Sequence, residues 1–408
     1  MNISYVVMQF PVPSETFAGV DVEALRRAGH VVNVYGMRPS HKMHREMIEQ
    51  RGLGGLHVEN FSIRSFFRFW GFLFLHPIIS LYLLKRVLRM RSRRHVAKSV
   101  VLYPSAISIF SSIYKSKPDV VHLFWGHYPS MIGALVKEYM PDTVLTQFLG
   151  AHDLLEGYPL AESLAQSLPV IFTHAESNVS SLQCIGVDNN KIRVVHRGID
   201  AAARSEDTPR TYGKVVKPIL ITASRLIDEK GVDNVLRAFK LVSAVYPNAK
   251  LYIAGDGPNR IYLEAEVIEL GIENHVVFLG HIDQRELIEL MRMSHFFVLM
   301  SRYRAERLPN VIKEAMLQGC VVVSTLTDGI TELVRHSNNG FLNSSGTPEE
   351  TASYVFDCIE NQILYKEVSE SAVDFVMKYF DSAVSMSEYV LVWDSLRAGH
   401  GGASGVGV

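Results

Sequence analysis

The sequence predicts an α/β fold made of two doubly wound domains. Its 408 residues are enough for two domains of ordinary size. Short runs rich in Val, Ile and Leu alternate with longer amphipathic runs over most of the chain, which is typical of parallel strands joined by crossover helices. A polar stretch at residues 201–217 interrupts this alternation, and we interpret it as the linker between the domains.

The composition is that of a folded protein without a dominant charge. Hydrophobic residues make up 48% of the chain and charged residues 20%, which excludes a fibrous or mostly unfolded protein. The 41 Lys and Arg residues nearly balance the 42 Asp and Glu residues, so we expect no nucleic-acid partner. The three separated cysteines fit neither a disulfide framework nor a metal site. A cytoplasmic location is therefore expected.

The first domain is predicted at residues 1–200. An apolar run at residues 3–10 predicts its first strand and lacks the features of a secretory signal. Further strands are predicted at DVVHLFW, TVLTQFLG, PVIFTHA and IRVVHRG. His122, His127 and His174 lie on or next to these strands, and we interpret them as core or cleft residues because no grouping has the spacing of metal ligands.

Aromatic, apolar and basic side chains occur together at residues 65–98. Phe69 to Leu84 carries no formal charge, but at about 1.5 Å per residue a helix of this length is shorter than the hydrocarbon core of a bilayer, which is about 30 Å thick. Seven cations follow up to Lys98 without an acidic residue among them. This mixture suits a segment lying on the surface of an anionic inner membrane. A buried helix followed by a solvated basic face is an equally good interpretation.

The second domain is predicted at residues 218–380. Its strands ILITAS, LYIAGD, VVFLG, FFVLMS and VVVST are each followed by a helix. These helices are expected to begin at Val232, Asn259, Asp283, Pro309 and Ile330. At the start of a further helix Thr347 can act as the cap, with Pro348 at the first helical position and Glu350 reaching back. We expect a C-terminal helix at 381–397 that packs on the first domain, and a disordered tail at 398–408.

Polar residues follow the strands of the second domain, where ligands bind in open α/β sheets. Arg225 and Lys230 lie in the loop after the first of these strands and could hold a diphosphate. The GDGP turn after the second strand permits a close backbone approach. Glu306 and Glu314 lie before and within the helix after the fourth strand, and both can accept hydrogen bonds from sugar or ribose hydroxyls. Each feature alone is common on protein surfaces, but their shared position at strand ends favours a binding site.

Residues 190–345 carry a nearly continuous set of motifs. These are RVVHRGID, ASRLIDEKGVD, LYIAGDGP, VVFLGHI, ERLPNVIKEAMLQG and VVVSTLTDGITELV followed by NNGFL. They resemble the motifs of family 4 retaining nucleotide-sugar glycosyltransferases (group 1 glycosyltransferases), whose GT-B fold has two facing Rossmann-like domains with an interdomain cleft. In the first half, FPVPSETF resembles bacterial exopolysaccharide enzymes of the colanic acid and amylovoran type, and LGAHD resembles the H-x-D-like loop on the acceptor side of the family.

The resemblance implies roles for the residues that match the motifs. Arg225 and Lys230 would hold the donor diphosphate, and Glu314 would bind the ribose. Glu306 and His152 are the implied catalytic residues, because both would contact the transferred sugar.

Further residues are placed around the donor and the acceptor by the same resemblance. The donor base and sugar would lie near Gly280, His281, Ile282, Arg307, Leu308 and Pro309, and the acceptor side would include Ser14, Glu15, Thr16 and Asp153. The nucleotide-diphosphate sugar is a co-substrate, and no cofactor is expected. The chain has no D-x-D motif, so we expect no metal requirement.

Arg307 departs from the family pattern, in which the residue after the first Glu is commonly Gly. One hypothesis is that Arg307 pairs with the carboxylate of an acidic donor sugar. The alternative is that its side chain points to solvent. Asp328 and Thr331 likewise replace a common Gly and Pro in the TDGITELV loop.

The expected function is retaining transfer of a hexose from a nucleotide-diphosphate sugar to a saccharide or lipid-linked oligosaccharide. The expected setting is the synthesis of bacterial exopolysaccharide or lipopolysaccharide, by a peripheral protein on the cytoplasmic face of the inner membrane. A nucleotide-sugar 2-epimerase and a catalytically degenerate partner subunit are the alternatives. A dinucleotide oxidoreductase is disfavoured because no G-x-G-x-x-G follows a predicted strand.

Overall fold

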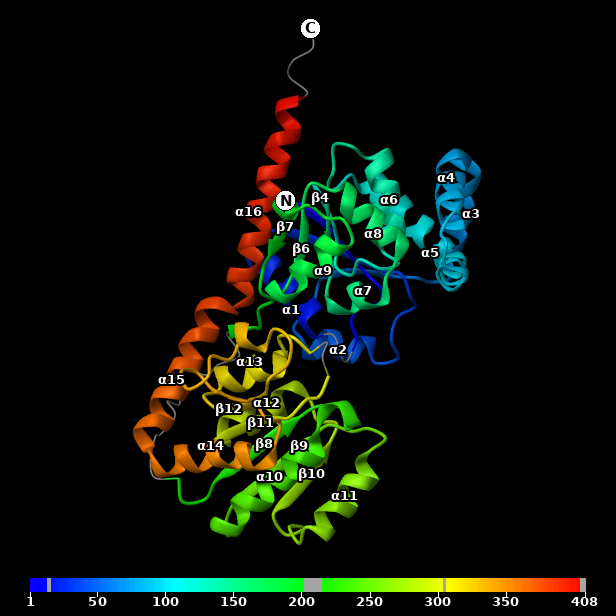
Figure 1. The fold of residues 1–408 in the computed structure, drawn as a ribbon. Helices are drawn as coiled ribbons and strands as arrows, with labels where there is room; N and C mark the ends of the chain where they lie inside the picture. The colour runs from blue at the N-terminus through cyan, green and yellow to red at the C-terminus, as the bar shows by residue number, and fades with distance from the viewer. Residues whose placement is uncertain (13–15, 202–214, 304–305, 404–408) are drawn as a thin grey trace. The chain divides into compact units, whose positions relative to one another are not determined.

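The computed structural model describes residues 1–12, 16–201, 215–303 and 306–403. The chain forms two compact units (Figure 1). Unit 1 contains Met1–Gly198 and Ser382–Val408, and unit 2 contains Ile199–Asp381. The division between the units therefore falls before the expected linker at 201–217, of which residues 202–214 lie outside the described part of the chain.

Unit 1 is built on a seven-stranded parallel sheet with the order β3-β2-β1-β4-β5-β6-β7. The chain builds outward from β1 to β3 and then returns to add β4 beside β1, so the direction of strand succession reverses between these two strands. The strands are β1 (Asn2–Val7), β2 (Val31–Gly36), β3 (His57–Asn60), β4 (Val120–Leu123), β5 (Val144–Phe148), β6 (Ile171–Thr173) and β7 (Ile192–Val194).

The helices of unit 1 belong to two separate stretches of the chain, Met1–Gly198 and Ser382–Val408. They are α1 (Thr16–Arg27), α2 (His44–Gln50), α3 (Ile63–Leu75), α4 (Pro77–Leu88), α5 (Arg93–Ser116), α6 (Ser130–Tyr139), α7 (Ala151–Glu156), α8 (Pro159–Ser167), α9 (Val179–Cys184) and α16 (Ser382–Ala403). The last of these packs against α1 and β5. It continues to Ala403, so residues 398–403 are helical where a disordered tail is expected from the sequence, and residues 404–408 lie outside the description.

The apolar segment of unit 1 forms two helices rather than one. Ser62 caps α3 by accepting a hydrogen bond from the Ser65 backbone N–H, and Pro77 occupies the first position of α4. The axes of α3 and α4 bend by 107° at their junction. Among the described helices, α5 alone is long and apolar enough to cross a membrane, with half of its most apolar window buried; α3 and α4 qualify only as one bent span.

Unit 2 is built on a six-stranded parallel sheet with the order β10-β9-β8-β11-β12-β13. Here the strand succession reverses between β8 and β11. The strands are β8 (Ile219–Ala223), β9 (Lys250–Ala254), β10 (Val276–Gly280), β11 (Phe296–Leu299), β12 (Val321–Thr325) and β13 (Phe341–Asn343). The α-helices are α10 (Val232–Val245), α11 (Arg260–Glu269), α12 (Gln284–Met293), α13 (Asn310–Leu317), α14 (Pro348–Glu360) and α15 (Gln362–Tyr379). The α/β class predicted from the sequence is confirmed in both units.

Two local predictions in unit 2 differ from the structure. The helix expected from Ile330 is a single 3-10 turn that ends at Glu332. Thr347 caps α14 as expected, but the Glu350 carboxylate does not reach back to it. Instead Glu350 accepts hydrogen bonds from the backbone N–H groups of Ser344 and Ser345, at 3.2 and 2.8 Å. Both serines lie in the turn between β13 and α14, which places their N–H groups within reach of this carboxylate.

Candidate functional site

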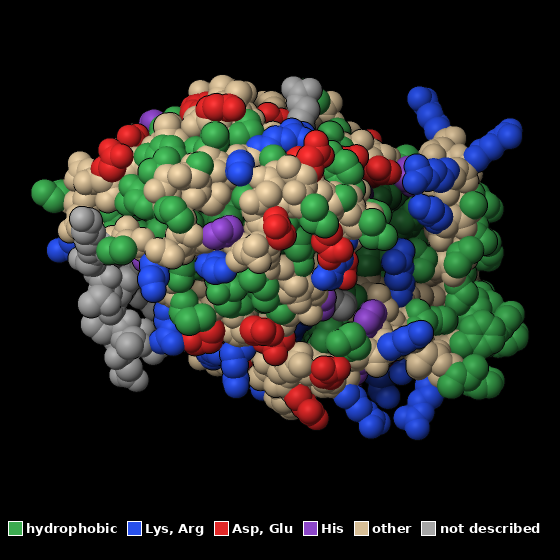
Figure 2. All heavy atoms as spheres, turned by 90° about the horizontal axis from the view of Figure 1, so that it is seen from below, with side chains coloured by type: hydrophobic (Ala, Val, Ile, Leu, Met, Phe, Trp, Pro, Cys, Tyr) green, Lys and Arg blue, Asp and Glu red, His purple; other side chains and the backbone are tan. Residues whose placement is uncertain are grey.

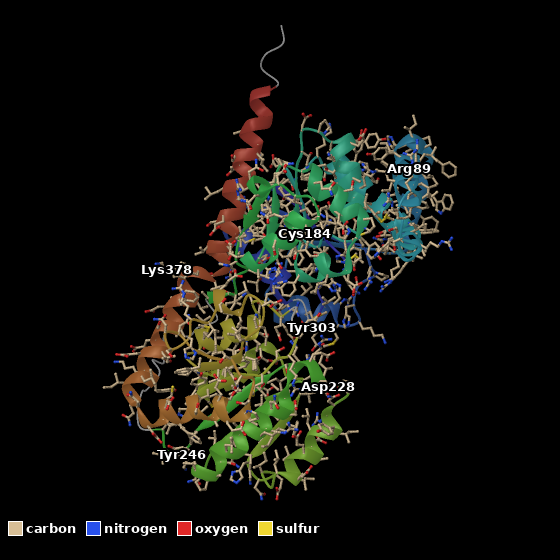
Figure 3. The ribbon with its side chains drawn as sticks, viewed as in Figure 1. Arg89, Cys184, Asp228, Tyr246, Tyr303 and Lys378 are labelled. Atoms are coloured by element: carbon tan, nitrogen blue, oxygen red, sulfur yellow. The ribbon has the colours of Figure 1, made fainter. Side chains whose placement is uncertain are left out.

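The loops after β8 and β11 meet at the point where the strand order of unit 2 reverses. The Lys230 ammonium donates to the Glu306 carboxylate, and the two side chains are only 14% and 12% exposed. The loops are also tied by their backbones, since Arg302 N–H donates to the Glu229 carbonyl oxygen at 2.7 Å. Figure 3 labels Asp228 and Tyr303, which belong to these two loops. Such reversal points are where open α/β sheets bind ligands.

Gly231 allows the two loops to approach this closely. It has φ +62°, and a Cβ atom placed on it would lie 1.9 Å from the Met300 carbonyl oxygen. A residue with a side chain would therefore be strained and would also collide with the backbone after β11. The 3-10 turn Asp228–Lys230 ends at this glycine, so Gly231 helps to set the position of Lys230.

The loop after β9 lies against the loop after β8. A Cβ atom on Gly255 would be 1.9 Å from the Ser224 carbonyl oxygen, and one on Gly257 would be 2.4 Å from that of Leu226. The glycines of the GDGP turn thus permit the close approach that the sequence indicates. Arg225 lies between these contacts, in the same loop as Lys230, and its side chain is exposed.

The segment that begins at Glu306 contains two polar atoms without hydrogen-bond partners. Both Glu306 Oε2 and Arg307 Nε are buried and lack a partner within the described residues. The backbone of Glu306 is held by Tyr303 on one side and by Thr327 on the other, with N···O and O···O distances of 3.0 and 2.9 Å. Unpaired buried groups are rare in folded proteins, and they are common at sites that bind ligands. Arg307 is half-buried, and its Nε atom is buried.

Glu314 lies in the second turn of α13, which begins directly after Leu308 and Pro309. Burial raises the pKa of the Glu314 carboxyl, while a hydrogen bond from the Gln284 side chain and the charge of Lys313 act in the opposite direction. Gln284 is the first residue of α12. The structure therefore brings Glu314 together with the connection between β10 and α12.

That connection contains the residues expected beside the donor base. Gly280 has φ +67°, and its carbonyl oxygen accepts from the Gly255 backbone N–H at 2.7 Å. His281 is exposed and Ile282 is half-buried. Leu308, which precedes α13, is buried. The candidate donor residues of unit 2 thus lie in loops that are linked to one another at one edge of the sheet.

The candidate residues of unit 1 differ in how deeply they are buried. His152 is exposed in the first turn of α7, whereas the neighbouring Asp153 is buried. One oxygen of Asp153 accepts from the Gly150 backbone N–H at 3.0 Å, and the other lies 2.9 Å from His127 Nδ1. Thr16 begins α1, while Ser14 and Glu15 lie outside the described residues.

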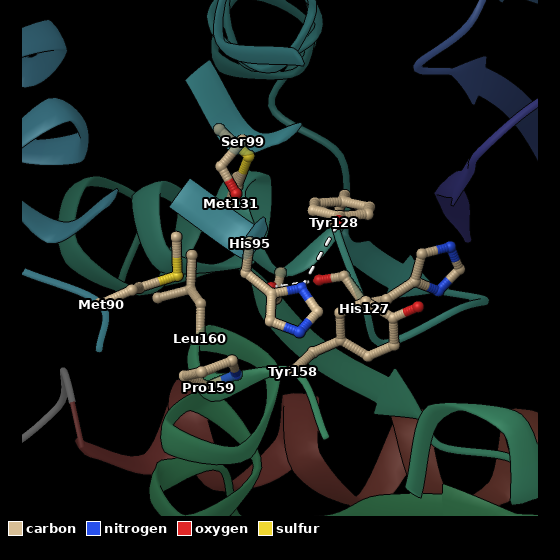
Figure 4. Close-up of a pocket in the computed structure, with 10 residues that line it drawn as sticks. Met90, His95, Ser99, His127, Tyr128, Met131, Tyr158, Pro159 and Leu160 are labelled. Carbon is tan, nitrogen blue, oxygen red and sulfur yellow. Dashed lines mark hydrogen bonds between the residues drawn. The ribbon is translucent and has the colours of Figure 1, made fainter. Parts of the chain in front are cut away.

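His127, which the sequence indicates as a core or cleft residue, lies beside Asp153. It follows β4, at the reversal of strand order in unit 1, and this position is the signal that could have identified it. Its ring is 14% exposed and lines a small pocket with His95, Tyr128 and Tyr158 (Figure 4). The pocket volume is about 10 Å³, close to that of a single water site.

Part of the chain matches a known protein family. Residues 204–374 match the family of group 1 glycosyl transferases. Similar curated proteins include N-acetyl-alpha-D-glucosaminyl L-malate synthase of Bacillus anthracis, which is 33% identical over 181 residues, covering 44% of this chain and 46% of that protein. Alpha-D-kanosaminyltransferase of Streptomyces kanamyceticus is 27% identical over 173 residues, covering 42% and 44%. The chain thus spans about half the length of the curated relatives it matches.

Solved structures share the fold of nearly the whole chain. Anabaena Alr3699/HepE in complex with UDP has a TM-score of 0.71 at 19% identity, covering 97% of this chain and all 100% of that one. The same protein with UDP-glucose gives 0.70 at 20% identity and the same coverage. Staphylococcus aureus TarM gives 0.67 at 10% identity, covering 96% and 99%. At these identities the likeness shows the fold alone, which is of the GT-B type.

Proposed function

We propose that this protein is a glycosyltransferase that takes its sugar from a nucleotide-diphosphate donor. The observation that carries the proposal is the contact between Lys230 and Glu306 at the strand reversal of unit 2. It lies inside the segment that matches the group 1 family, and Arg225 is exposed on the same loop. A paired cation and carboxylate at this edge provide recognition for a phosphate and for a sugar hydroxyl.

Each charged residue has a role that its surroundings support. Arg225 and Lys230 bind the diphosphate and stabilise the negative charge that develops on it as the glycosidic bond breaks. Glu306 accepts hydrogen bonds from the transferred sugar, which gives its unpaired Oε2 a partner. Glu314 binds the ribose hydroxyls, and Gly280, His281 and Ile282 lie along the base.

The acceptor side is assigned to unit 1. His152 contacts the donor sugar, and Thr16 and Asp153 lie on the acceptor side with Ser14 and Glu15, which are outside the described residues. The transferred sugar is a hexose, its anomeric configuration is retained, and the reaction needs neither a protein nucleophile nor a metal. The lack of a D-x-D motif in the sequence supports the last point.

The acceptor is a saccharide or a lipid-linked oligosaccharide of the bacterial surface, built on the cytoplasmic face of the inner membrane. The support is the exposed surface of residues 65–98. Hydrophobic side chains cover this part of unit 1 and Lys and Arg side chains flank them, at the right of Figure 2. A soluble protein rarely exposes a continuous apolar patch of this kind unless it contacts a partner or a membrane.

Thermal unfolding with a panel of nucleoside diphosphates and nucleotide sugars tests the donor proposal. A ligand present at about 100 times its Kd adds about 2.7 kcal/mol to the folded state, which raises the Tm measurably. We expect one nucleotide to raise the Tm, and we expect Lys230→Ala and Glu314→Ala to remove the shift. Lys366→Ala, at an exposed position of α15, is the control that keeps it. If no nucleotide in the panel changes the Tm, the donor proposal fails.

A further inference from the structure

A basic groove lies between α4 and α8 in unit 1. Its volume is about 590 Å³. It is lined by Lys85, Arg86, Arg89 and Arg91 together with the apolar side chains of Met90 and Leu160. Figure 3 labels Arg89, at the end of α4. The groove therefore combines four cations with an apolar floor.

The cations of the groove are available to a ligand. Lys85, Arg89 and Arg91 are exposed, and the sequence has no acidic residue between Glu59 and Asp119. Arg86 differs from the other three. It donates to the Tyr82 hydroxyl at 2.8 Å, and that hydroxyl donates to a Glu138 oxygen at 3.1 Å. The residues that line the groove include four cations and no carboxylate, so the groove keeps a positive potential.

The outer face of α3 and α4 exposes large apolar side chains beside the groove. Phe74, Leu75 and Ile78 are 77%, 78% and 76% exposed. Leu81 and Leu88 continue this apolar face along α4, in the same helix as Lys85 and Arg89. A surface that joins exposed aromatic and aliphatic groups to a cluster of cations matches the boundary between the acyl chains and the phosphates of a bilayer.

We propose that this groove binds the phosphate group of a membrane lipid whose chains contact the exposed face of α3 and α4. Arginine guanidinium groups form paired hydrogen bonds with phosphate oxygens, and three of the four cations are arginines. Met90 and Leu160 also line the pocket that contains His127, so the bound phosphate lies next to the candidate acceptor-side residues of unit 1. Resting on the proposed function, the lipid is the one that carries the acceptor.

Vesicle binding by the full chain tests this site. Phosphatidic acid presents a bare phosphate, while phosphatidylglycerol carries the same kind of charge on a phosphodiester. The experiment uses two kinds of phosphatidylcholine vesicle, which contain either phosphatidic acid or phosphatidylglycerol at equal surface charge. The wild-type protein should bind the phosphatidic acid vesicles about tenfold more tightly, which corresponds to about 1.4 kcal/mol.

Two matched triple variants separate the groove from general surface charge. Lys85→Gln/Arg89→Gln/Arg91→Gln should abolish the preference for phosphatidic acid. The variant Arg64→Gln/Arg93→Gln/Lys98→Gln removes the same charge from exposed positions of α3 and α5 outside the groove, and it should keep the preference while binding both vesicles more weakly. Equal loss of preference in both variants, or its absence in the wild type, would overturn the proposal.

Two further measurements keep the result decisive. If the groove variant does not fold, Arg89→Lys/Arg91→Lys keeps the charge but not the paired hydrogen bonds, and it should still reduce the preference severalfold. Displacement of the protein from vesicles by equimolar glycerol 3-phosphate would show that a free phosphate is the ligand and would reject the lipid. Vesicle binding requires no nucleotide-sugar donor, so a protein that fails to bind vesicles can still be a glycosyltransferase. Likewise, a nucleotide panel that leaves the Tm unchanged does not affect the proposal for the groove.

Discussion

Lys230 and Glu306 lie 76 positions apart in the sequence and form an ion pair that joins two loops of unit 2. The proposed roles assign the cation to the donor diphosphate and the carboxylate to the transferred sugar. Because both side chains are largely buried, each one compensates the charge of the other. The pair therefore links recognition of the two halves of the donor.

Glu306→Gln should strengthen the binding of the stabilising nucleoside diphosphate while it slows sugar transfer. Without the carboxylate, Lys230 no longer shares its charge, and the affinity should rise severalfold, by up to about 1.4 kcal/mol. Lys230→Ala should weaken the same binding by at least that amount. Isothermal titration calorimetry measures both effects. If Glu306→Gln weakens binding as much as Lys230→Ala does, Glu306 does not compete with the diphosphate for Lys230.

Gly231→Ala should lower the free energy of unfolding much more than Gly271→Ala. Both glycines have positive φ, +62° and +67°, but a Cβ atom meets the Met300 carbonyl only at Gly231, and nothing lies within 4 Å of it at Gly271. We expect about 1 kcal/mol for Gly271→Ala and about 3 kcal/mol or more for Gly231→Ala. Urea denaturation gives both values, and similar losses would contradict the close approach of the two loops.

Trp393→Ala should destabilise unit 1 strongly. The Trp393 side chain is completely buried, and its indole N–H donates to Thr146 Oγ1 at 3.0 Å. Removing a buried Trp side chain costs about 3 to 5 kcal/mol. Leu391→Ala, at an exposed position of the same helix, should change stability by less than about 0.5 kcal/mol. Equal effects in chemical denaturation would mean that α16 does not contribute to this core.

His122 should make unit 1 sensitive to acid. Burial, with a smaller contribution from the charge of Arg197, lowers the pKa of His122 from 6.5 to about 3. Between these values the unfolded chain binds a proton that the folded chain does not, so the stabilisation present at neutral pH is lost as the pH falls from 6.5 towards 3.

The His122→Gln variant measures this contribution directly. It should flatten the decrease in unfolding free energy between pH 7 and pH 5 relative to the wild-type protein. The total difference is on the order of a few kcal/mol. If the pH profiles of wild type and His122→Gln run in parallel, His122 does not titrate as described.

Arg307→Gly should change the choice between acidic and neutral donors. Arg307 Nε is buried without a hydrogen-bond partner in the described residues, directly after Glu306. A guanidinium in this position can bind the carboxylate of a uronic acid. Competition between a uronic acid donor and its neutral counterpart in the transfer reaction should shift about tenfold or more towards the neutral sugar. An unchanged ratio would remove Arg307 from donor selection.

The fold could be predicted because its local signals agree with one another. The buried parallel strands appear as continuous apolar runs, as in VVVST, which forms β12. Asp283 and Thr347 cap the helices that they precede. The exception at Ile330 has a physical reason, because Gly329 with φ +84° starts a turn that ends after three residues.

The site could be predicted only in part. Arg225, Lys230 and Glu306 could be placed at strand ends, since the order of strands along the chain implies their common edge. The contact between His127 and Asp153 could not be predicted in this way. It depends on the neighbouring positions of β4 and β5 and on the rotamer of a buried carboxylate, and neither leaves a periodic pattern in the sequence.

The return of α16 to unit 1 has a consequence for how the chain folds during synthesis. Phe172 stacks on Tyr389 with ring centroids 4.0 Å apart, and His122 contacts the ring of Trp393. On the ribosome these partners emerge only after all of unit 2, which is one continuous stretch of chain. Unit 2 can therefore complete its core while unit 1 still has an open aromatic surface, and this nascent intermediate is the species that chaperones would have to protect.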